Sequence, residues 1–234
     1  MTYHETRVME ICNTMTGNNA SVDFGTRFRW PILALAAVLF VPLFRLQRIG
    51  PLDFWWWMSA TQAVLLALAY GTDAGARRAL ADDLSSGLLR KLLLGLLSAV
   101  LLYAVFWAGN ILSRRLLPFA SGGIEAVYGF KSGASTLRVT LLIGLVIGPG
   151  EELFWRGWLQ RALGARRGPV AGWLLATALY TGIHLASGNP MLLLAALVCG
   201  LFWGWLYLRY RSLILVAISH TVWDLAVFLL FPLG

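Results

Sequence analysis

Five acidic or histidine side chains lie within long apolar stretches of this 234-residue sequence, where charge is costly. They are Glu151, Glu152, His184, His220 and Asp224, which include three of the eleven acidic residues and two of the three histidines. A charged group at the centre of a membrane-spanning helix costs about 2.5–3.5 kcal/mol on insertion scales. Two adjacent glutamates in such a segment therefore indicate a functional site, and carboxylates with histidines are the usual groups of acid–base chemistry.

The two adjacent glutamates are expected to differ in role. On a helix, Glu152 and Arg156 are four residues apart and share a face, so they can form an ion pair. Glu151 is rotated by about 100° from Glu152 and lies off that face. We therefore expect Glu151 to be the catalytic carboxylate, while Glu152 and Arg156 support the site.

The histidines belong to two further patterns. His220 and Asp224 are four residues apart, so they share a face of the last apolar stretch. Tyr180 precedes His184 by one helical turn, which can bring its hydroxyl to the same cavity. In one hydrolytic arrangement Glu151 and His184 activate water, and His220 with Asp224 stabilises the oxyanion.

A metal centre is the second hydrolytic arrangement. Glu151, His184 and His220 form a plausible zinc ligand set with water in the open position. The sequence has no His-Glu-x-x-His motif, so the common zinc-peptidase spacing does not support it. We favour a site without a metal or other cofactor, and zinc stays open as the alternative.

These residues must be positioned by membrane-spanning helices. A span needs about 20 mostly apolar residues. Seven stretches qualify: residues 30–46, 54–70, 92–112, 137–160, 169–187, 190–208 and 213–231. An eighth element, re-entrant or on the surface, is expected within 116–130. We predict an all-α, polytopic transmembrane helical bundle in one domain (30–234) behind a polar N-terminal tail (1–29).

Composition supports the membrane interpretation and excludes other classes. Apolar residues make up 59% of the chain and charged residues 13%, whereas soluble domains carry about 25% charged residues. Only two cysteines, Cys12 and Cys199, are present, which excludes a secreted disulfide scaffold. The net charge of +8 comes mostly from residues between apolar stretches, so we expect the lipid bilayer, not nucleic acid, as the partner.

The distribution of Lys and Arg predicts the orientation, because cytoplasmic loops are enriched in both. With the N-terminus in the cytoplasm, most basic residues fall on the inner side and the C-terminus lies outside. The outer side then holds Arg45, Arg48, Arg114, Arg115, Lys131 and Arg138. The cluster in 113–138 is an exception to the rule. We expect an integral protein of the bacterial inner (plasma) membrane.

Three motifs resemble the CPBP family (CAAX proteases and bacteriocin-processing enzymes, also called Abi), which includes the type II CAAX prenyl endopeptidases. Glu151-Glu152-x-x-x-Arg156 matches the family's first motif. Tyr180-x-x-x-His184 matches the second with Tyr in place of the usual Phe, and His220-x-x-x-Asp224 matches the third. The resemblance covers about residues 137–231, which would form the catalytic core.

This resemblance implies an intramembrane endopeptidase whose cavity opens towards the cytoplasm. It also implies the glutamate mechanism, in which Glu151 and His184 activate the water and His220 with Asp224 holds the oxyanion. An ionised Asp224 cannot donate to an oxyanion, so Asp224 would either be protonated or orient His220. We expect the substrate to be a peptide or protein with a membrane-proximal tail. Two other functions stay open: a non-catalytic self-immunity or scaffold protein, and a proton-coupled transporter, for which no inverted repeat is visible.

Overall fold

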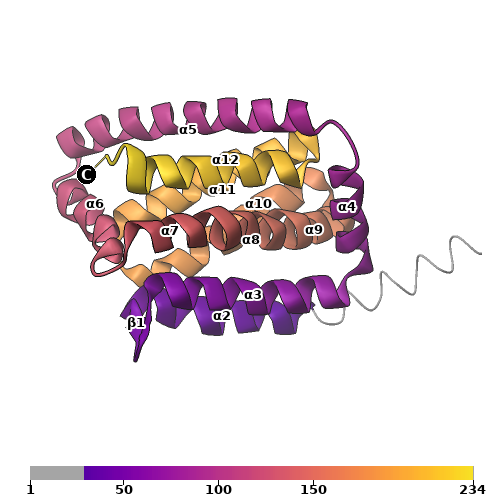
Figure 1. The fold of residues 1–234 in the computed structure, drawn as a ribbon, viewed down its shortest axis with the longest axis horizontal. Coiled ribbons are helices and arrows are strands. Elements are labelled where there is room, and N and C mark those ends of the chain that lie inside the picture. Colours follow the sequence, from indigo (N-terminus) through magenta and orange to yellow (C-terminus); the bar gives the residue numbers. More distant parts are fainter. Residues whose placement is uncertain (1–28, 234) are drawn as a thin grey trace, which may run out of the picture.

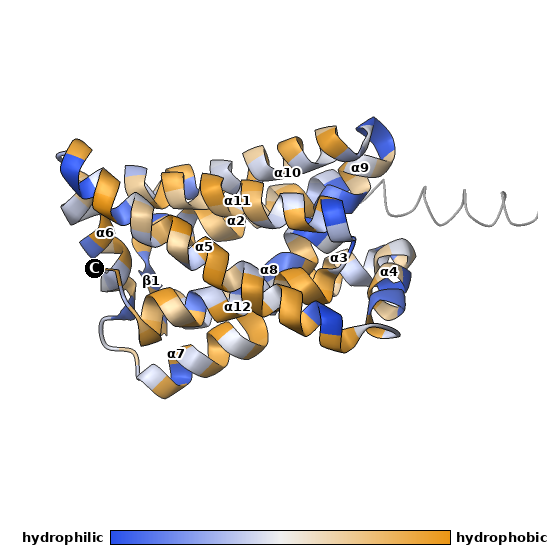
Figure 2. Ribbon diagram, turned by 90° about the horizontal axis from the view of Figure 1, so that it is seen from above, coloured by the Kyte–Doolittle hydropathy of each residue, from blue (hydrophilic) through white to orange (hydrophobic). Residues whose placement is uncertain are grey.

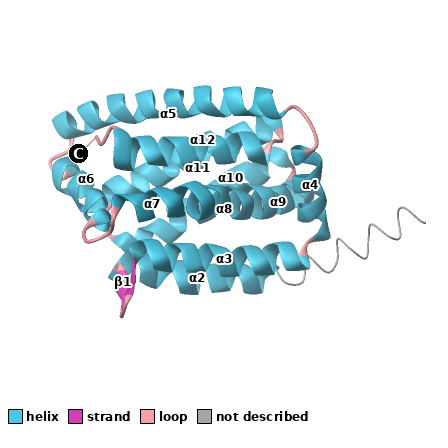
Figure 3. Cartoon of the chain, viewed as in Figure 1, coloured by secondary structure: helices cyan, strands magenta, loops and turns pink. Residues whose placement is uncertain are grey.

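The computed structural model describes residues 29–233, and they form a bundle of long helices that run back and forth between two ends (Figure 1; Figure 3). Six of these helices are α2 (Arg29–Leu46), α3 (Phe54–Thr72), α5 (Leu88–Leu116), α10 (Pro169–His184), α11 (Pro190–Tyr210) and α12 (Leu213–Leu225). The predicted all-α, polytopic helical bundle is confirmed. Of the predicted tail (1–29), residues 1–28 lie outside the described residues, and Arg29 is the first residue of α2.

A seventh long rod carries the two glutamates. It is helical throughout residues 136–167 and changes its winding along its length. Its segments are α7 (Thr136–Leu142), the π-helical η2 (Ile143–Ile147), α8 (Gly148–Glu152), the π-helical η3 (Leu153–Gln160) and α9 (Arg161–Arg167). Pro149 lacks an N–H, so it cannot form the regular helical hydrogen bond one turn back. The glutamates thus lie between two π-helical segments, which are frequent at functional sites.

Shorter elements connect the long helices. They are the hairpin β1 (Arg48–Ile49) and β2 (Leu52–Asp53), α4 (Ala74–Leu84), α6 (Ala120–Tyr128), η1 (Gly129–Lys131), η4 (Leu185–Ser187) and the π-helical η5 (Ala226–Leu230). The element predicted within 116–130 is α6 with η1, whose axis is bent by 94° from the rod that follows. Helix α4 was not predicted from the sequence.

Local signals define where several helices begin. The side chain of Asp53 accepts a hydrogen bond from the Trp56 N–H at the start of α3. Ser212 caps α12 in the same way by accepting from the Leu215 N–H. Such caps satisfy backbone donors that have no partner within the helix. Gly168 separates α9 from α10 with φ of +90°, a conformation that favours glycine.

A short helix marks each end of the bundle, so the two ends are called the α4 end and the α6 end. The α4 end holds α4, the starts of α2, α5, α10 and α12, and the ends of α3, α9 and α11 (Figure 1). The α6 end holds α6, the β-hairpin, η5 and the opposite helix termini. Figure 2 shows hydrophilic residues gathered at both ends, with mostly hydrophobic helix between them. This distribution is that of an integral membrane protein.

Each predicted span corresponds to a helix, although not all of them meet a strict criterion for crossing a membrane. Five helices are long and apolar enough: α2, α5, α10 with η4, α11, and α12 with η5. A sixth is counted if α6 and the bent rod together form one span. The predicted span at residues 54–70, which is α3, is not among them. Large aromatic side chains, including Trp155, Trp158 and Trp203, fill the centre of the bundle.

Candidate active site

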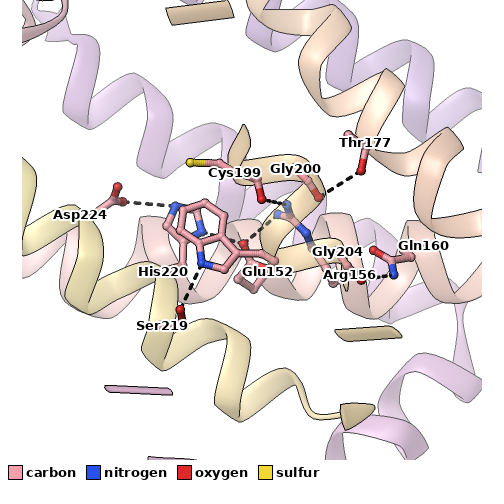
Figure 4. Close-up of polar contacts among 11 residues, drawn as sticks. Glu152, Arg156, Gln160, Thr177, Cys199, Gly200, Gly204, Ser219, His220 and Asp224 are labelled. Atoms are coloured by element: carbon pink, nitrogen blue, oxygen red, sulfur yellow. Dashed lines mark hydrogen bonds and ion pairs between the residues drawn. The ribbon is translucent and has the colours of Figure 1, made fainter. Parts of the chain in front are cut away.

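Glu152 is the centre of a buried polar network (Figure 4). Its side chain is 0% exposed, and its Oε1 accepts from Arg156 Nη1 at 2.7 Å and contacts His220 Nδ1 at 2.6 Å. The predicted pair of Glu152 and Arg156 is therefore present. The contact from Glu152 to His220, which joins the rod to α12, was not predicted. It could not be found from spacing, because the two residues are 68 positions apart.

Arg156 carries its charge into the apolar interior with several compensating contacts. Its guanidinium carbon lies 5.0 Å from the ring centroid of Tyr180 and 5.7 Å from that of Trp203. Both distances are within the range of cation–π attraction. Its Nη2 donates to the Cys199 carbonyl oxygen at 3.4 Å. Arg156 thus links the rod to α10 and α11, beyond its ion pair with Glu152.

His220 is held on both edges and on one face. Its Nδ1 contacts Glu152, and its Nε2 lies 3.4 Å from Asp224 Oδ2. Trp203 stacks on the ring with centroids 3.7 Å apart and planes 19° apart, and Trp203 Nε1 donates to Ser219 Oγ at 3.2 Å. A ring between two carboxylate oxygens donates to both only when both nitrogens carry protons. Trp203 was missed by the sequence analysis, since nothing in its neighbourhood distinguishes it from the other ten tryptophans.

Glu151 has a different environment from its neighbour. It is 6% exposed, and its Oε2 is buried without a hydrogen-bond partner among residues 29–233. Gly148, one turn before Glu152, lets the rod approach α12, because a Cβ there would lie about 3.1 Å from Thr221 Cα. Glu152 Oε2 is buried without a partner among residues 29–233 as well, so the two glutamates differ at Glu152 Oε1, which is bonded to Arg156 and His220.

His184 lies at the end of α10 and is oriented by its own helix. Its Nδ1 is 2.8 Å from the Tyr180 carbonyl oxygen, which can only accept, so Nδ1 is the donor. In the neutral ring this leaves Nε2 with a lone pair. Phe44 packs on the imidazole with centroids 4.4 Å apart, and Tyr180 packs on it edge-on at 4.9 Å.

A cavity of about 400 Å³ brings the predicted residues together. It is lined by Glu151, Tyr180, His184, His220 and Asp224. Most of its other lining residues are apolar, contributed by α3, α5, α6 and α11. Glu152 and Arg156 do not line the cavity, and Glu152 is connected to it through His220. An apolar pocket with a few convergent polar groups is the typical form of a binding or catalytic site.

The geometry offers the zinc alternative no support. Within the described part of the chain, no three His, Cys, Asp or Glu side chains are grouped so that they could hold a metal ion. Glu152 engages His220 Nδ1 at 2.6 Å, so a metal would have to bind His220 through Nε2, which lies 3.4 Å from Asp224 Oδ2. Zinc at Glu151, His184 and His220 stays a hypothesis for experiment.

Comparison with known proteins confirms the family relationship predicted from the motifs. Residues 133–226 match the model of the type II CAAX prenyl endopeptidase Rce1-like family. This segment contains the Glu151, His184 and His220 motifs together. No curated protein and no solved structure matches the chain. The family relationship supports a protease of the CAAX type, in agreement with a helical bundle that has several spans.

Proposed function

We propose that this protein is an intramembrane endopeptidase in which Glu151 activates water to hydrolyse a peptide bond. The observation that carries the proposal is the contrast between the adjacent glutamates. Oε1 of Glu152 is bonded to Arg156 and His220, and Glu152 does not line the cavity. Glu151 does line it, and although Oε2 is buried without a partner in both glutamates, only that of Glu151 belongs to a residue at the cavity. An unpartnered buried carboxylate is costly, and its retention beside two histidines is explained if it reacts.

Water activation is assigned to Glu151 and His184. A water molecule held between the free Glu151 oxygen and His184 Nε2 gives its proton to Glu151. The resulting hydroxide oxygen attacks the scissile carbonyl carbon. When the C–N bond breaks, Glu151 returns the proton to the leaving nitrogen, so the carboxylate is regenerated. The Tyr180 carbonyl supports this role by directing the lone pair of His184 to Nε2.

Oxyanion stabilisation is assigned to His220. Glu152 orients the ring through Nδ1, so Nε2–H can donate to the developing negative charge. The 3.4 Å separation from Asp224 is long for a charge-assisted hydrogen bond, which leaves this donor available to the substrate. Asp224 is then a positioning residue, and no proton on its carboxyl is required.

The substrate is proposed to be a peptide or protein with a membrane-proximal tail. The cavity lies inside a bundle of apolar helices, and its largely apolar wall favours apolar substrate side chains. A polypeptide tail beside the bilayer can enter such a space in an extended form. No cofactor is part of the proposal.

The test measures new peptide termini by mass spectrometry in membranes that contain candidate tailed substrates. Wild type is compared with Glu151→Ala and His184→Ala, each with and without a zinc chelator. Asp82→Asn, which removes an exposed carboxylate on α4, is the matched control. We expect termini from wild type and the control that survive chelation and are absent from both site variants.

Each other result contradicts a defined part of the proposal. Termini that vanish with chelator and return with zinc would establish the metal mechanism in place of the glutamate one. Identical termini from wild type and both site variants, across a broad substrate set, would favour the non-catalytic immunity or scaffold function.

A further inference from the structure

Tyr180 lies in the wall of the cavity with its ring held on several sides. The Arg156 guanidinium carbon lies 5.0 Å from the ring centroid, and the rings of Trp155 and His184 pack on it with centroids at 5.4 Å and 4.9 Å. The backbone of α11 is also close, because a Cβ at Gly200 would lie 3.3 Å from Tyr180 Cδ1. These contacts fix the ring, and with it the direction in which the hydroxyl points.

The Tyr180 hydroxyl has no hydrogen-bond partner within the described part of the chain. Beyond its helix backbone, Tyr180 forms one hydrogen bond among residues 29–233, through the carbonyl oxygen that accepts from His184 Nδ1. Tyr70, by contrast, donates its hydroxyl to the Leu153 carbonyl oxygen at 3.2 Å, as buried tyrosines usually do. The Tyr180 oxygen is not one of the fully buried oxygens that lack a partner, so it contacts open space. The space that Tyr180 lines is the cavity.

Several other hydrogen-bond donors in the cavity wall are already in use. Asn110 Nδ2 and Tyr128 Oη each donate to a backbone carbonyl oxygen, at 2.8 Å and 3.0 Å. Ser113 Oγ does the same at 3.1 Å, and Trp203 Nε1 donates to a serine hydroxyl at 3.2 Å. Each of these groups would have to give up a contact within the protein before it could donate to a substrate.

Few donors are left for a negative charge that develops in the cavity. Asp224 cannot donate when it is ionised, and the unpartnered indole N–H of Trp223 is fully buried. The side-chain donors that remain among the described lining residues are His220 Nε2–H, the weak thiol of Cys199 and the Tyr180 hydroxyl. An oxyanion is stabilised by donors that are held in place before the reaction. The fixed ring of Tyr180 supplies such a donor.

Tyr180 is also placed between the two helices that carry the proposed water-activating pair. It precedes His184 by one turn of α10, and the two rings are in contact. On its other side, Arg156 and Trp155 belong to the same rod as Glu151. Glu151 and Tyr180 line the same cavity. A peptide carbonyl attacked by water between Glu151 and His184 would therefore lie beside the wall that Tyr180 forms.

We propose that Tyr180 is a further catalytic residue, whose hydroxyl donates a hydrogen bond to the scissile carbonyl oxygen and shares oxyanion stabilisation with His220. This proposal rests on the proposed function, because it assigns a role in the same reaction. When the hydroxide oxygen bonds to the carbonyl carbon, the π electrons of the C=O bond move to its oxygen, and both hydrogen bonds strengthen. Neither donor gives up its proton. When the C–N bond breaks, those electrons re-form the C=O bond, and the leaving nitrogen takes the proton held by Glu151.

The deciding variant is Tyr180→Phe, which removes the hydroxyl and keeps both the ring packing and the carbonyl contact to His184. The probe is a synthetic peptide that spans the bond located by the termini experiment, cleaved by purified protein in detergent. We expect kcat to fall by about 10²–10³-fold, the usual effect of removing one oxyanion donor. KM should change little, because the interaction is made in the transition state. The thermal midpoint should stay the same, because the hydroxyl has no partner in the described protein to lose.

Tyr207→Phe is the matched control. Tyr207 is a second buried tyrosine, 4% exposed on α11, and it does not line the cavity. The same atom is thus removed from the same bundle away from the site, and we expect the kcat and KM of wild type. A fall in kcat shared equally by Tyr180→Phe and Tyr207→Phe would show a general effect of losing a buried hydroxyl and would overturn the proposal.

The other outcomes separate this proposal from the proposed function. An unchanged kcat in Tyr180→Phe, with or without a raised KM, overturns the catalytic role and leaves Glu151-dependent cleavage intact. A thermal midpoint that falls together with kcat shows that the hydroxyl is structural, and it also overturns the role. If Glu151→Gln cleaves the peptide as well as wild type does, the proposed function itself fails.

Discussion

Glu151 and Glu152 are adjacent on one helix, yet the regions around them differ in their polar contacts and in their access to the cavity. Around Glu152, the side chains of Arg156, His220 and Trp203 form a connected set of short contacts. Around Glu151, a cavity and a free oxygen take the place of such partners. Oε2 of Glu152 is also buried without a partner among residues 29–233, so the distinguishing features are the contacts at Glu152 Oε1 and the cavity beside Glu151. A reacting group needs such access to substrate or water. The comparison supports a division in which Glu152 positions the side chains around it and Glu151 is the group that reacts.

The largest expected effect comes from the free carboxylate. Glu151→Gln keeps the shape of the side chain and removes the base, so we expect cleavage to fall by about 10²–10⁴-fold. The thermal midpoint in detergent should stay unchanged or rise, because a buried carboxylate with an unpartnered oxygen is removed. Cleavage rate and thermal unfolding are measured on the same preparation. A marked loss of stability in this variant would show that Glu151 is structural, and the contrast between the two glutamates would fail.

The next effect should appear in stability. Arg156→Ala leaves Glu152 buried without its cation, and breaking a buried ion pair from one side costs about 3–5 kcal/mol. We expect a comparable loss in the free energy of unfolding in detergent. Adding Glu152→Gln to this variant should restore part of it, because no unpaired charge then remains on that side of the network.

The double-mutant cycle supplies the check on this prediction. Coupling between the two positions is the difference between the effect of the double change and the sum of the single effects. A coupling near zero would contradict a shared network. In that case the short distances among Glu152, Arg156 and His220 would not reflect interactions that contribute to the free energy of unfolding.

The sequence predicted the fold, and that Glu151, His184 and His220 lie at one cavity, better than it predicted the contacts among these side chains. The length of the apolar stretches alone located the long helices. A membrane-spanning segment must form all its backbone hydrogen bonds internally, as a helix does, and it needs a minimum number of residues to cross the bilayer. Spacing of four residues predicted the pair of Glu152 and Arg156, which depends only on helix geometry.

Contacts between helices could not be predicted in this way. Glu152 meets His220 only because the rod packs on α12, and Trp203 stacks on His220 from a third helix. Such contacts depend on how each helix is rotated and how closely two helices approach. The spacing of residues along a single sequence does not reveal either. The sequence also missed α4, whose 11 residues are too few and too polar for a span.

The smallest effect should come from the edge of the network around Glu152. Trp203→Phe keeps an aromatic face on His220 and Arg156 but removes the indole donor to Ser219, whose side chain is 0% exposed. Loss of one buried hydrogen bond and some ring volume should cost about 1–2 kcal/mol of folding free energy. Cleavage should change little, because Glu152 still orients His220 through Nδ1. Comparing Trp203→Phe with Trp203→Leu then separates stacking from the hydrogen bond. If both variants lose cleavage equally while remaining folded, the indole N–H, not the aromatic face, positions His220, and the network must extend through Ser219 to the cavity.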